Sequence, residues 1–224
     1  DKTHFIAEWL RSESKVTLIT RPRRFGKTTL LSTVENFLDP RFGGHSEYFE
    51  KLQVWTEEDC RTLYGTIPVI SVSFGSCKGR DYAQAIRGMI SSFYNLYESH
   101  RYLMEGEKLD AEDKAVYQRM KKALEMGDET KAESAIPRLC RLLYRYYGIW
   151  PVILLDEYDT PLLEAYTDGY WEEMIGTCRQ LFHAAFKENA YYSRAIITGV
   201  TRVTKNSLFS DLNNIEVDTV TCCL

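Results

Sequence analysis

The strongest constraint on the fold is the segment RPRRFGKT, residues 21–28, which joins a strand-like run to a helical pattern. Its end fits the pattern G-x-x-x-x-G-K-[ST], in which loop N–H groups and a helix N-terminus surround phosphate groups. Gly26 permits close approach of the backbone, Lys27 supplies a mobile positive charge, and the Thr28 hydroxyl can ligate Mg²⁺. The first position is Arg21 instead of glycine, and Pro22 biases Arg21 toward extended backbone. The segment predicts a phosphate-binding P-loop, and a chance match is the alternative.

Strand and helix patterns alternate along the rest of the chain, which favours an α/β fold with a mostly parallel sheet. The predicted strands are residues 15–20, 67–74, 151–155 and 191–198. The predicted helices are residues 27–38, 81–105, part of 107–131, 135–147 and 170–189. Pro137 is expected in the first turn of its helix, because proline would break the helix at any later position.

A second motif follows the wholly apolar run at 151–155, which is typical of a central strand buried on both faces. It ends in Asp156 and Glu157. In open α/β sheets, ligands lie outside the carboxyl ends of the strands. We expect Asp156 to hold Mg²⁺ and Glu157 to act as general base on the attacking water. The alternative is a strand that ends in two solvated acids, but the two motifs together, in this order, favour nucleotide binding.

Further polar residues follow strand ends or lie in the loop. Thr198 ends another predicted strand and could contact the γ-phosphate or the water, or simply end the strand. Arg202 could stabilise charge on the transferring phosphoryl group, although a solvated or ion-paired arginine is slightly favoured. Arg23 and Arg24 could contact phosphate, but structural ion pairing is at least as favoured. Asp159 could join the outer shell of the metal, and capping the helix near residue 161 is the favoured interpretation.

Composition narrows the function classes. The net charge of -4 argues against a broad duplex-binding surface. The six cysteines include no CxxC pair, so reduced thiols are the simplest interpretation. No apolar run is long enough to span a membrane, and we expect a cytoplasmic protein. The stretch 204–207 lacks the aspartate of a guanine-recognition motif, which favours adenine.

Several blocks resemble the bacterial AAA-ATPase-like family. They are Asp1–Thr3 with Phe5–Ile6, Leu18–Thr28, Leu154–Leu162, Thr198–Arg202, Ser207–Ser210 and Leu212–Asn214. The family has arginine at the first P-loop position, so Arg21 agrees with it. The resemblance implies a three-layer, AAA/STAND-like P-loop NTPase in which the strand bearing Asp156 and Glu157 lies between the P-loop strand and its neighbours. It also implies that Asp1, Lys2 and Thr3 lie near the nucleotide, and that a PD-(D/E)XK nuclease-like domain commonly follows.

Together these observations predict one P-loop ATPase domain over residues 1–224, with a helical insertion at about 81–147 and a further C-terminal effector domain. The expected ligands are ATP and Mg²⁺, and the expected catalytic residues are Lys27, Glu157, Thr198 and Arg202. Thr28 and Asp156 are the expected metal ligands. The expected nucleotide-binding residues are Arg23, Arg24, Phe25, Gly26, Lys27, Thr28, Thr29, Asp1 and Lys2.

We expect slow or partner-stimulated hydrolysis that regulates the effector domain. Two alternatives stay open: a non-catalytic nucleotide switch, and a protein- or DNA-interaction domain with a vestigial P-loop. A homo-oligomer also stays open, because many P-loop ATPases complete their site with an arginine from a neighbouring subunit. Nucleic acid is expected to be only an indirect partner.

Overall fold

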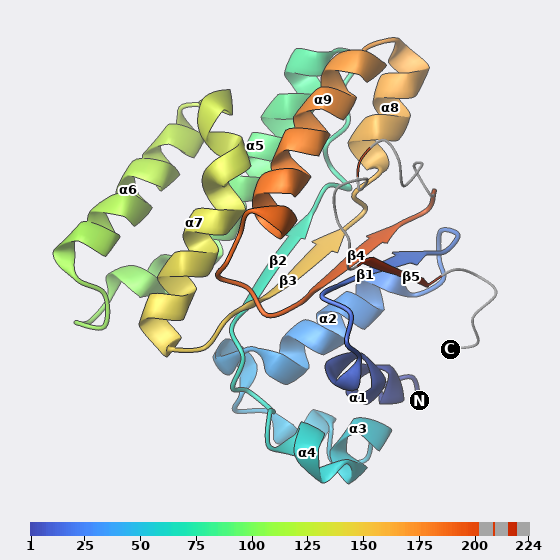
Figure 1. The fold of residues 1–224 in the computed structure, drawn as a ribbon, viewed down its shortest axis with the longest axis vertical. Helices are drawn as coiled ribbons and strands as arrows, with labels where there is room; N and C mark the ends of the chain where they lie inside the picture. The colour runs from blue at the N-terminus through green and yellow to red at the C-terminus, as the bar shows by residue number, and fades with distance from the viewer. Residues whose placement is uncertain (202–207, 209–214, 219–224) are drawn as a thin grey trace.

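A computed structural model describes residues 1–201, 208 and 215–218. Its centre is a parallel sheet of five strands in the order β2-β3-β4-β1-β5 (Figure 1). The strands are β1 Val16–Thr20, β2 Val69–Ser73, β3 Val152–Asp156, β4 Ala195–Gly199 and β5 Ile215–Asp218. This architecture confirms the predicted α/β class, because helices cover both faces of the sheet.

One face of the sheet is covered by the N-terminal helices. They are α1 His4–Arg11, α2 Lys27–Leu38, α3 Gln53–Thr56 and α4 Glu58–Arg61. Short 3₁₀ turns at Pro40–Phe42 and Ser46–Tyr48 connect α2 to α3. Leu154 and Ile196 point into this layer, where they form one core with Phe37 of α2.

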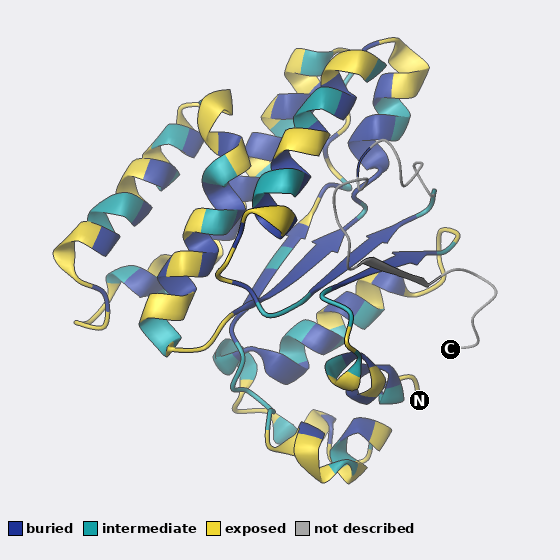
Figure 2. Ribbon diagram, viewed as in Figure 1, coloured by how far each residue is buried: buried dark blue, intermediate teal, exposed yellow. Residues whose placement is uncertain are grey.

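The opposite face is covered by the later helices. They are α5 Tyr82–Ser99, α6 Ala111–Glu125, α7 Glu129–Tyr147, α8 Thr160–Asp168 and α9 Trp171–Phe182, with a 3₁₀ turn at Arg101–Met104 and a π-helical turn at His183–Lys187. Leu155 and Ile197 pack here with Phe93 of α5. Successive strand residues point to opposite faces, so strands covered on both sides must be apolar throughout. Figure 2 shows the central strands buried along their length.

The helix α2 has the predicted bounds. The helix α7 ends at Tyr147 as predicted, but its predicted start was wrong. The helix begins at Glu129, not near residue 135, because the Asp128 carboxylate accepts a hydrogen bond from the Thr130 N–H and caps it there. Pro137 therefore lies inside the helix, where it removes one backbone hydrogen bond. Burial of Ile136 and Leu139 in the core offsets that loss and keeps the helix continuous.

Four other expectations differ from the structure. The helix predicted at 81–105 ends as an α-helix at Ser99, and a 3₁₀ turn follows at Arg101–Met104. The helix predicted at 170–189 ends as an α-helix at Phe182 and changes to the π-helical turn. The strand predicted at 191–198 begins only at Ala195. The resemblance implied that the strand bearing Asp156 and Glu157 lies between the P-loop strand and its neighbours. In the structure, β4 lies between this strand, β3, and the P-loop strand β1. The strand β5, beyond β1, was not predicted at all.

Two further findings concern the cysteines and the question of a membrane-spanning helix. Cys60, Cys77, Cys140 and Cys178 are free and buried, while Cys222 and Cys223 lie outside the described residues. Among the helices of the described ranges, none is both long and apolar enough to cross a membrane.

Candidate nucleotide site

The loop between β1 and α2 encloses the ammonium group of Lys27. Its Nζ donates hydrogen bonds to the carbonyl oxygens of Arg21, at 2.8 Å, and Pro22, at 2.9 Å. Two residues of the loop have left-handed backbone angles, Arg24 with φ 67° and Gly26 with φ 77°. These turns bring the loop back to the start of α2, so the lysine lies in the curve of the loop at the helix N-terminus. Such a terminus favours an anion.

Asp156 is the centre of the polar groups beside the loop. One carboxylate oxygen accepts a hydrogen bond from the Thr28 hydroxyl at 2.6 Å. The other accepts from the Thr198 hydroxyl and, at 3.0 Å, from the Glu157 N–H. The structure thus brings together three predicted site residues that come from α2, β3 and β4. They meet at the carboxyl edge of the parallel sheet.

Glu157 lies beside Asp156, toward β2. Its backbone has φ 52°, an uncommon value for a residue other than glycine. Its carboxylate accepts a hydrogen bond from the Thr160 hydroxyl at 3.1 Å. It also packs against Gly75, where a Cβ atom would lie 2.9 Å from the carboxylate oxygen. Gly75 therefore leaves the space that this carboxylate occupies, which sequence reasoning had not foreseen.

Asp159 does not cap α8 with its side chain, which corrects the favoured sequence interpretation. Its Oδ2 atom instead accepts hydrogen bonds from the N–H groups of Val200, at 2.8 Å, and Thr201, at 2.6 Å. The Thr201 hydroxyl donates to the same oxygen at 2.7 Å. The carboxylate points toward the segment after β4 because the N–H donors of Val200 and Thr201 lie there. The first turn of α8 therefore has no side-chain cap from Asp159.

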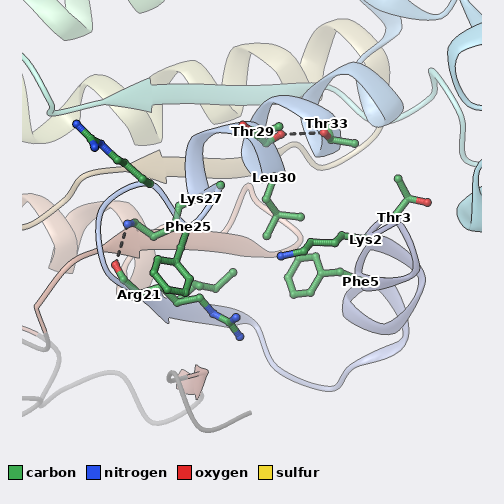
Figure 3. A pocket seen from close by; sticks show the side chains of 12 residues that line it. Lys2, Thr3, Phe5, Arg21, Phe25, Lys27, Thr29, Leu30 and Thr33 are labelled. Carbon is green, nitrogen blue, oxygen red and sulfur yellow. Dashed lines mark hydrogen bonds between the residues drawn. The ribbon is translucent and has the colours of Figure 1, made fainter. Parts of the chain in front are cut away.

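A pocket of about 630 Å³ opens beside the loop (Figure 3). Twelve residues line it: Lys2, Thr3, Phe5, Ile19, Arg21, Arg24, Phe25, Gly26, Lys27, Thr29, Leu30 and Thr33. Four of these described lining residues are basic and none is acidic, which suits an anionic ligand. The apolar side chains of Phe5, Ile19 and Leu30 suit a flat, largely apolar group.

The predicted nucleotide-binding residues divide into two groups. Those in the pocket lining are Lys2, Arg24, Phe25, Gly26, Lys27 and Thr29. Thr28 faces Asp156, and the exposed Arg23 is not in the lining. The Asp1 carboxylate accepts hydrogen bonds from Thr3 and, at 2.6 Å, from the Gln53 N–H, and it borders a different pocket. Arg202 lies outside the described residues.

The resemblance placed Lys2 and Thr3 near the nucleotide, but the contribution of Phe5 in α1 to the pocket was not predicted. Thr3 and Phe5 belong to the N-terminal turn of α1, and Figure 3 shows Lys2 and Phe5 pointing across the pocket toward Leu30. The available signal was the spacing of Phe5, Ile6 and Trp9, which is that of an amphipathic helix. Thr33 and Leu30 lie on the same face of α2, three residues apart.

The oxygen donors at the sheet edge fit a magnesium ion. The Thr28 hydroxyl and the Asp156 carboxylate are already in contact, and both are hard oxygen ligands of the kind that Mg²⁺ prefers. Within the described part of the chain, no group of three or more His, Cys, Asp or Glu side chains could hold a metal ion. A site with only two protein ligands suits Mg²⁺ that also binds phosphate oxygens.

Comparison with known proteins agrees with this geometry. Residues 1–209 match the model of the AAA-ATPase-like family, described as a predicted AAA-ATPase. The chain is also 30% identical over 217 residues to the "Uncharacterized protein in vnfD 5'region" of Azotobacter chroococcum mcd 1. That match covers 96% of this chain and 36% of the relative. No solved structure matches the chain.

Proposed function

The chain belongs to the AAA-ATPase-like family, and from this premise we propose that it binds ATP with Mg²⁺, hydrolyses it slowly and regulates an attached effector domain. The observation that carries the proposal is the convergence of Lys27, Thr28 and Asp156 at the carboxyl edge of the sheet. The lysine belongs to the phosphate-binding loop, and the other two residues provide the metal ligands.

The phosphates bind in the curve of the loop, and the nucleoside binds in the adjoining pocket. Lys27 donates to the carbonyl oxygens of Arg21 and Pro22, and we propose that it exchanges these acceptors for phosphate oxygens when ATP binds. The proposed base packs on Phe5 and Leu30, and Lys2 and Arg24, which line the same pocket, are the proposed contacts to polar groups of the nucleotide. Adenine is the proposed base, because the sequence lacks the guanine motif.

Hydrolysis needs a group that accepts a proton from water. Glu157 takes that proton while the water oxygen bonds to the γ-phosphorus and the bond to the bridging oxygen of ADP breaks. Lys27 stabilises the charge on the phosphoryl oxygens. Bound Mg²⁺ supplies further neutralisation of that charge. Thr198, fixed on Asp156, is the proposed sensor of the γ-phosphate, and Arg202 is a proposed second contributor.

The regulatory part of the proposal rests on the length of the related protein from Azotobacter chroococcum mcd 1. The chain spans 36% of the relative's length, so most of that protein lies outside the matched region. We propose that an effector domain, nuclease-like as in members of the resembled family, receives the nucleotide state of this domain. A homo-oligomer that supplies an arginine in trans is a further part of the proposal, and nucleic acid is contacted only through the effector.

Titration calorimetry of Mg·ATP tests the binding step. We expect micromolar affinity, about -8 kcal/mol, in the wild-type chain and none in Lys27→Ala. The exposed Lys131 on α7 provides a matched control, since Lys131→Ala removes one positive charge far from the loop. Thermal unfolding of each variant shows whether the chain remains folded. A folded wild type without affinity for ATP would favour the interaction domain with a vestigial P-loop.

Phosphate release tests the catalytic step. Glu157→Gln should bind Mg·ATP with nearly unchanged affinity but hydrolyse it roughly 100-fold more slowly, as expected for loss of a general base. A variant as fast as wild type would remove Glu157 from this role. Retained nucleotide with no phosphate release by the wild type would instead favour a non-catalytic switch, which the contact between Glu157 and Thr160 would also suit.

A further inference from the structure

Two backbone segments are fastened together at the carboxyl edge of the sheet. They are the turn at 156–159, after β3, and the segment at 198–201, at the end of β4. The Tyr158 N–H donates to the Thr198 carbonyl oxygen at 3.0 Å, and the Tyr158 hydroxyl donates to the Thr201 carbonyl oxygen at 2.9 Å. Asp159 completes the connection through its three bonds to Val200 and Thr201.

The Asp159 carboxylate is only 1% exposed. Burial of a charge is costly unless hydrogen bonds compensate for it, and bonds to a charged acceptor are the stronger kind. All of its bonds lie on Oδ2, whereas Oδ1 is buried and has no hydrogen-bond partner in the described ranges. Asp159 is also absent from the lining of the nucleotide pocket. Its interactions therefore act on the segment after β4, not on a ligand.

The side chains of Tyr158 and Asp159 approach the backbone of Gly199 closely. A Cβ atom on Gly199 would lie 2.5 Å from a ring carbon of Tyr158 and 2.8 Å from Oδ1 of Asp159. The Tyr158 ring is itself fully buried and cannot easily move aside. Thr198, directly before Gly199, donates its hydroxyl to Asp156. The position of that hydroxyl thus depends on how firmly residues 199–201 are held.

We propose that Asp159 is a positioning residue that clamps residues 199–201 to the β3 turn and thereby holds the Thr198 hydroxyl on Asp156. This inference rests on the proposed ATPase function for its effect on turnover, but the clamp itself does not depend on turnover. It assigns a role to an acidic residue three positions after Asp156, where a helix cap was expected from sequence.

Turnover and affinity should separate in variants of Asp159. Asp159→Ala loses all three bonds, so kcat should fall at least about tenfold, while the Kd for Mg·ATP stays within about threefold because the phosphate-binding groups are untouched. Asp159→Asn keeps an oxygen that can accept the bonds and should restore kcat to within about threefold of wild type. Asp113→Ala, which removes a buried aspartate of α6 that binds Arg145, controls for general loss of stability.

Hydrogen exchange provides a readout that needs no hydrolysis. The Val200 and Thr201 amides should exchange at least about tenfold faster in Asp159→Ala than in wild type. In Asp113→Ala, their exchange rates should be the same as in wild type. Unchanged exchange, equal losses of kcat and affinity, or a folded Asp159→Asn as slow as Asp159→Ala would overturn the clamp. If the wild type hydrolyses no ATP, the proposed function fails, and the exchange rates alone decide the inference.

Discussion

Within the described residues, left-handed backbone angles outside glycine occur at the carboxyl edge of the sheet. Arg24 and Glu157 are the described residues other than glycine with left-handed backbone angles. Such a conformation costs about 1–2 kcal/mol for a residue with a Cβ atom. Strain of this kind persists where the surrounding structure holds it, and it is common at functional sites. Arg24 lies in the loop two residues before Gly26, and Glu157 lies directly after β3, where its carboxylate contacts Thr160 and Gly75.

Replacement of Arg24 tests the strain directly. Arg24→Gly removes the steric cost at φ 67°, so the free energy of unfolding without nucleotide should rise by about 0.5–1 kcal/mol. Urea denaturation measures this change. The neighbouring Arg23 has the same charge without the left-handed backbone, so Arg23→Gly should not stabilise the chain. Equal effects of the two substitutions would show that charge, and not backbone strain, determines the result.

The space at Gly75 offers a test of the placement of Glu157. An alanine Cβ would lie 2.9 Å from the carboxylate and must displace it. Because the end of a glutamate side chain moves easily, Gly75→Ala should change the unfolding free energy by less than about 0.5 kcal/mol, as for an ordinary surface substitution. The rate of phosphate release should fall at least about tenfold, since a displaced base loses its alignment.

The control for this substitution is Gly44→Ala, since open space surrounds a Cβ atom at that position. It should leave both stability and phosphate release nearly unchanged. If Gly75→Ala hydrolyses ATP at the wild-type rate, the position of the Glu157 carboxylate beside Gly75 is not the position in which it serves as general base. Steady-state phosphate release, measured with urea denaturation on the same samples, separates the two effects.

The sequence predicted those site residues whose neighbours in the chain define a motif. Lys27 and Thr28 follow a strand, and Asp156 ends a wholly apolar one, so local pattern was sufficient. Gly75 and Asp159 were not foreseen in their roles, because each depends on a contact with a distant segment. The space at Gly75 exists only because β2 pairs with β3, and the partners of Asp159 lie more than 40 residues later.

At the scale of elements, a helix end was predicted correctly from the sequence where a single capping or helix-breaking signal marked it. Asp39 and Pro40 ended α2 at the predicted residue. Within α7, by contrast, the cap at Asp128 and the breaker at Pro137 conflict, and burial of the flanking side chains decides in favour of the cap. The residue patterns did not indicate the order of the strands, and the position that the resemblance implied for β3 was wrong, because the order depends on pairing between segments far apart in the chain.

His100 joins the end of α5 to the start of β2. Its Nδ1 lies 2.8 Å from the Leu96 carbonyl oxygen and its Nε2 lies 3.2 Å from the Val69 carbonyl oxygen. Burial, together with the positive charge of Arg41, lowers the pKa of His100 from 6.5 to about 4. Between pH 4 and 6.5, His100 is therefore mostly neutral in the folded chain and mostly protonated in the unfolded chain.

This difference predicts a loss of stability on acidification. Above pH 6.5 the ring is neutral in both states, so the full stability is present there. As the pH falls from 6.5 toward 4, the unfolded state gains a proton and the free energy of unfolding falls by about 3 kcal/mol through this group. Urea denaturation across this range should show a smaller loss in His100→Gln, which cannot titrate. Parallel curves for the two proteins would contradict the assignment.

At the scale of the whole molecule, two hydrophobic cores share one sheet. Leu154 and Leu155 are adjacent in β3, yet they belong to opposite cores. The proposed nucleotide pocket is lined by residues of α1, β1, α2 and the segments next to them, and its apolar residues Phe5 and Ile19 belong to the core on that side. The helices α5, α6, α7 and α9 pack on the other side. Loss of either core would expose apolar surface of the sheet, so the two layers should unfold together.

The proposed nucleotide site makes this cooperativity measurable. A ligand that binds only the folded state stabilises it by about 2.7 kcal/mol at a concentration of 100 times its Kd. Mg·ADP should therefore raise the unfolding free energy of both layers by the same amount, although it contacts only one. Far-UV circular dichroism and hydrogen exchange of Phe93 in α5 should report equal shifts, and Lys27→Ala should show none. Two separate unfolding transitions, only one of which shifts when Mg·ADP is added, would contradict this prediction. They would mean that the two layers unfold independently and that the shared strands do not couple them.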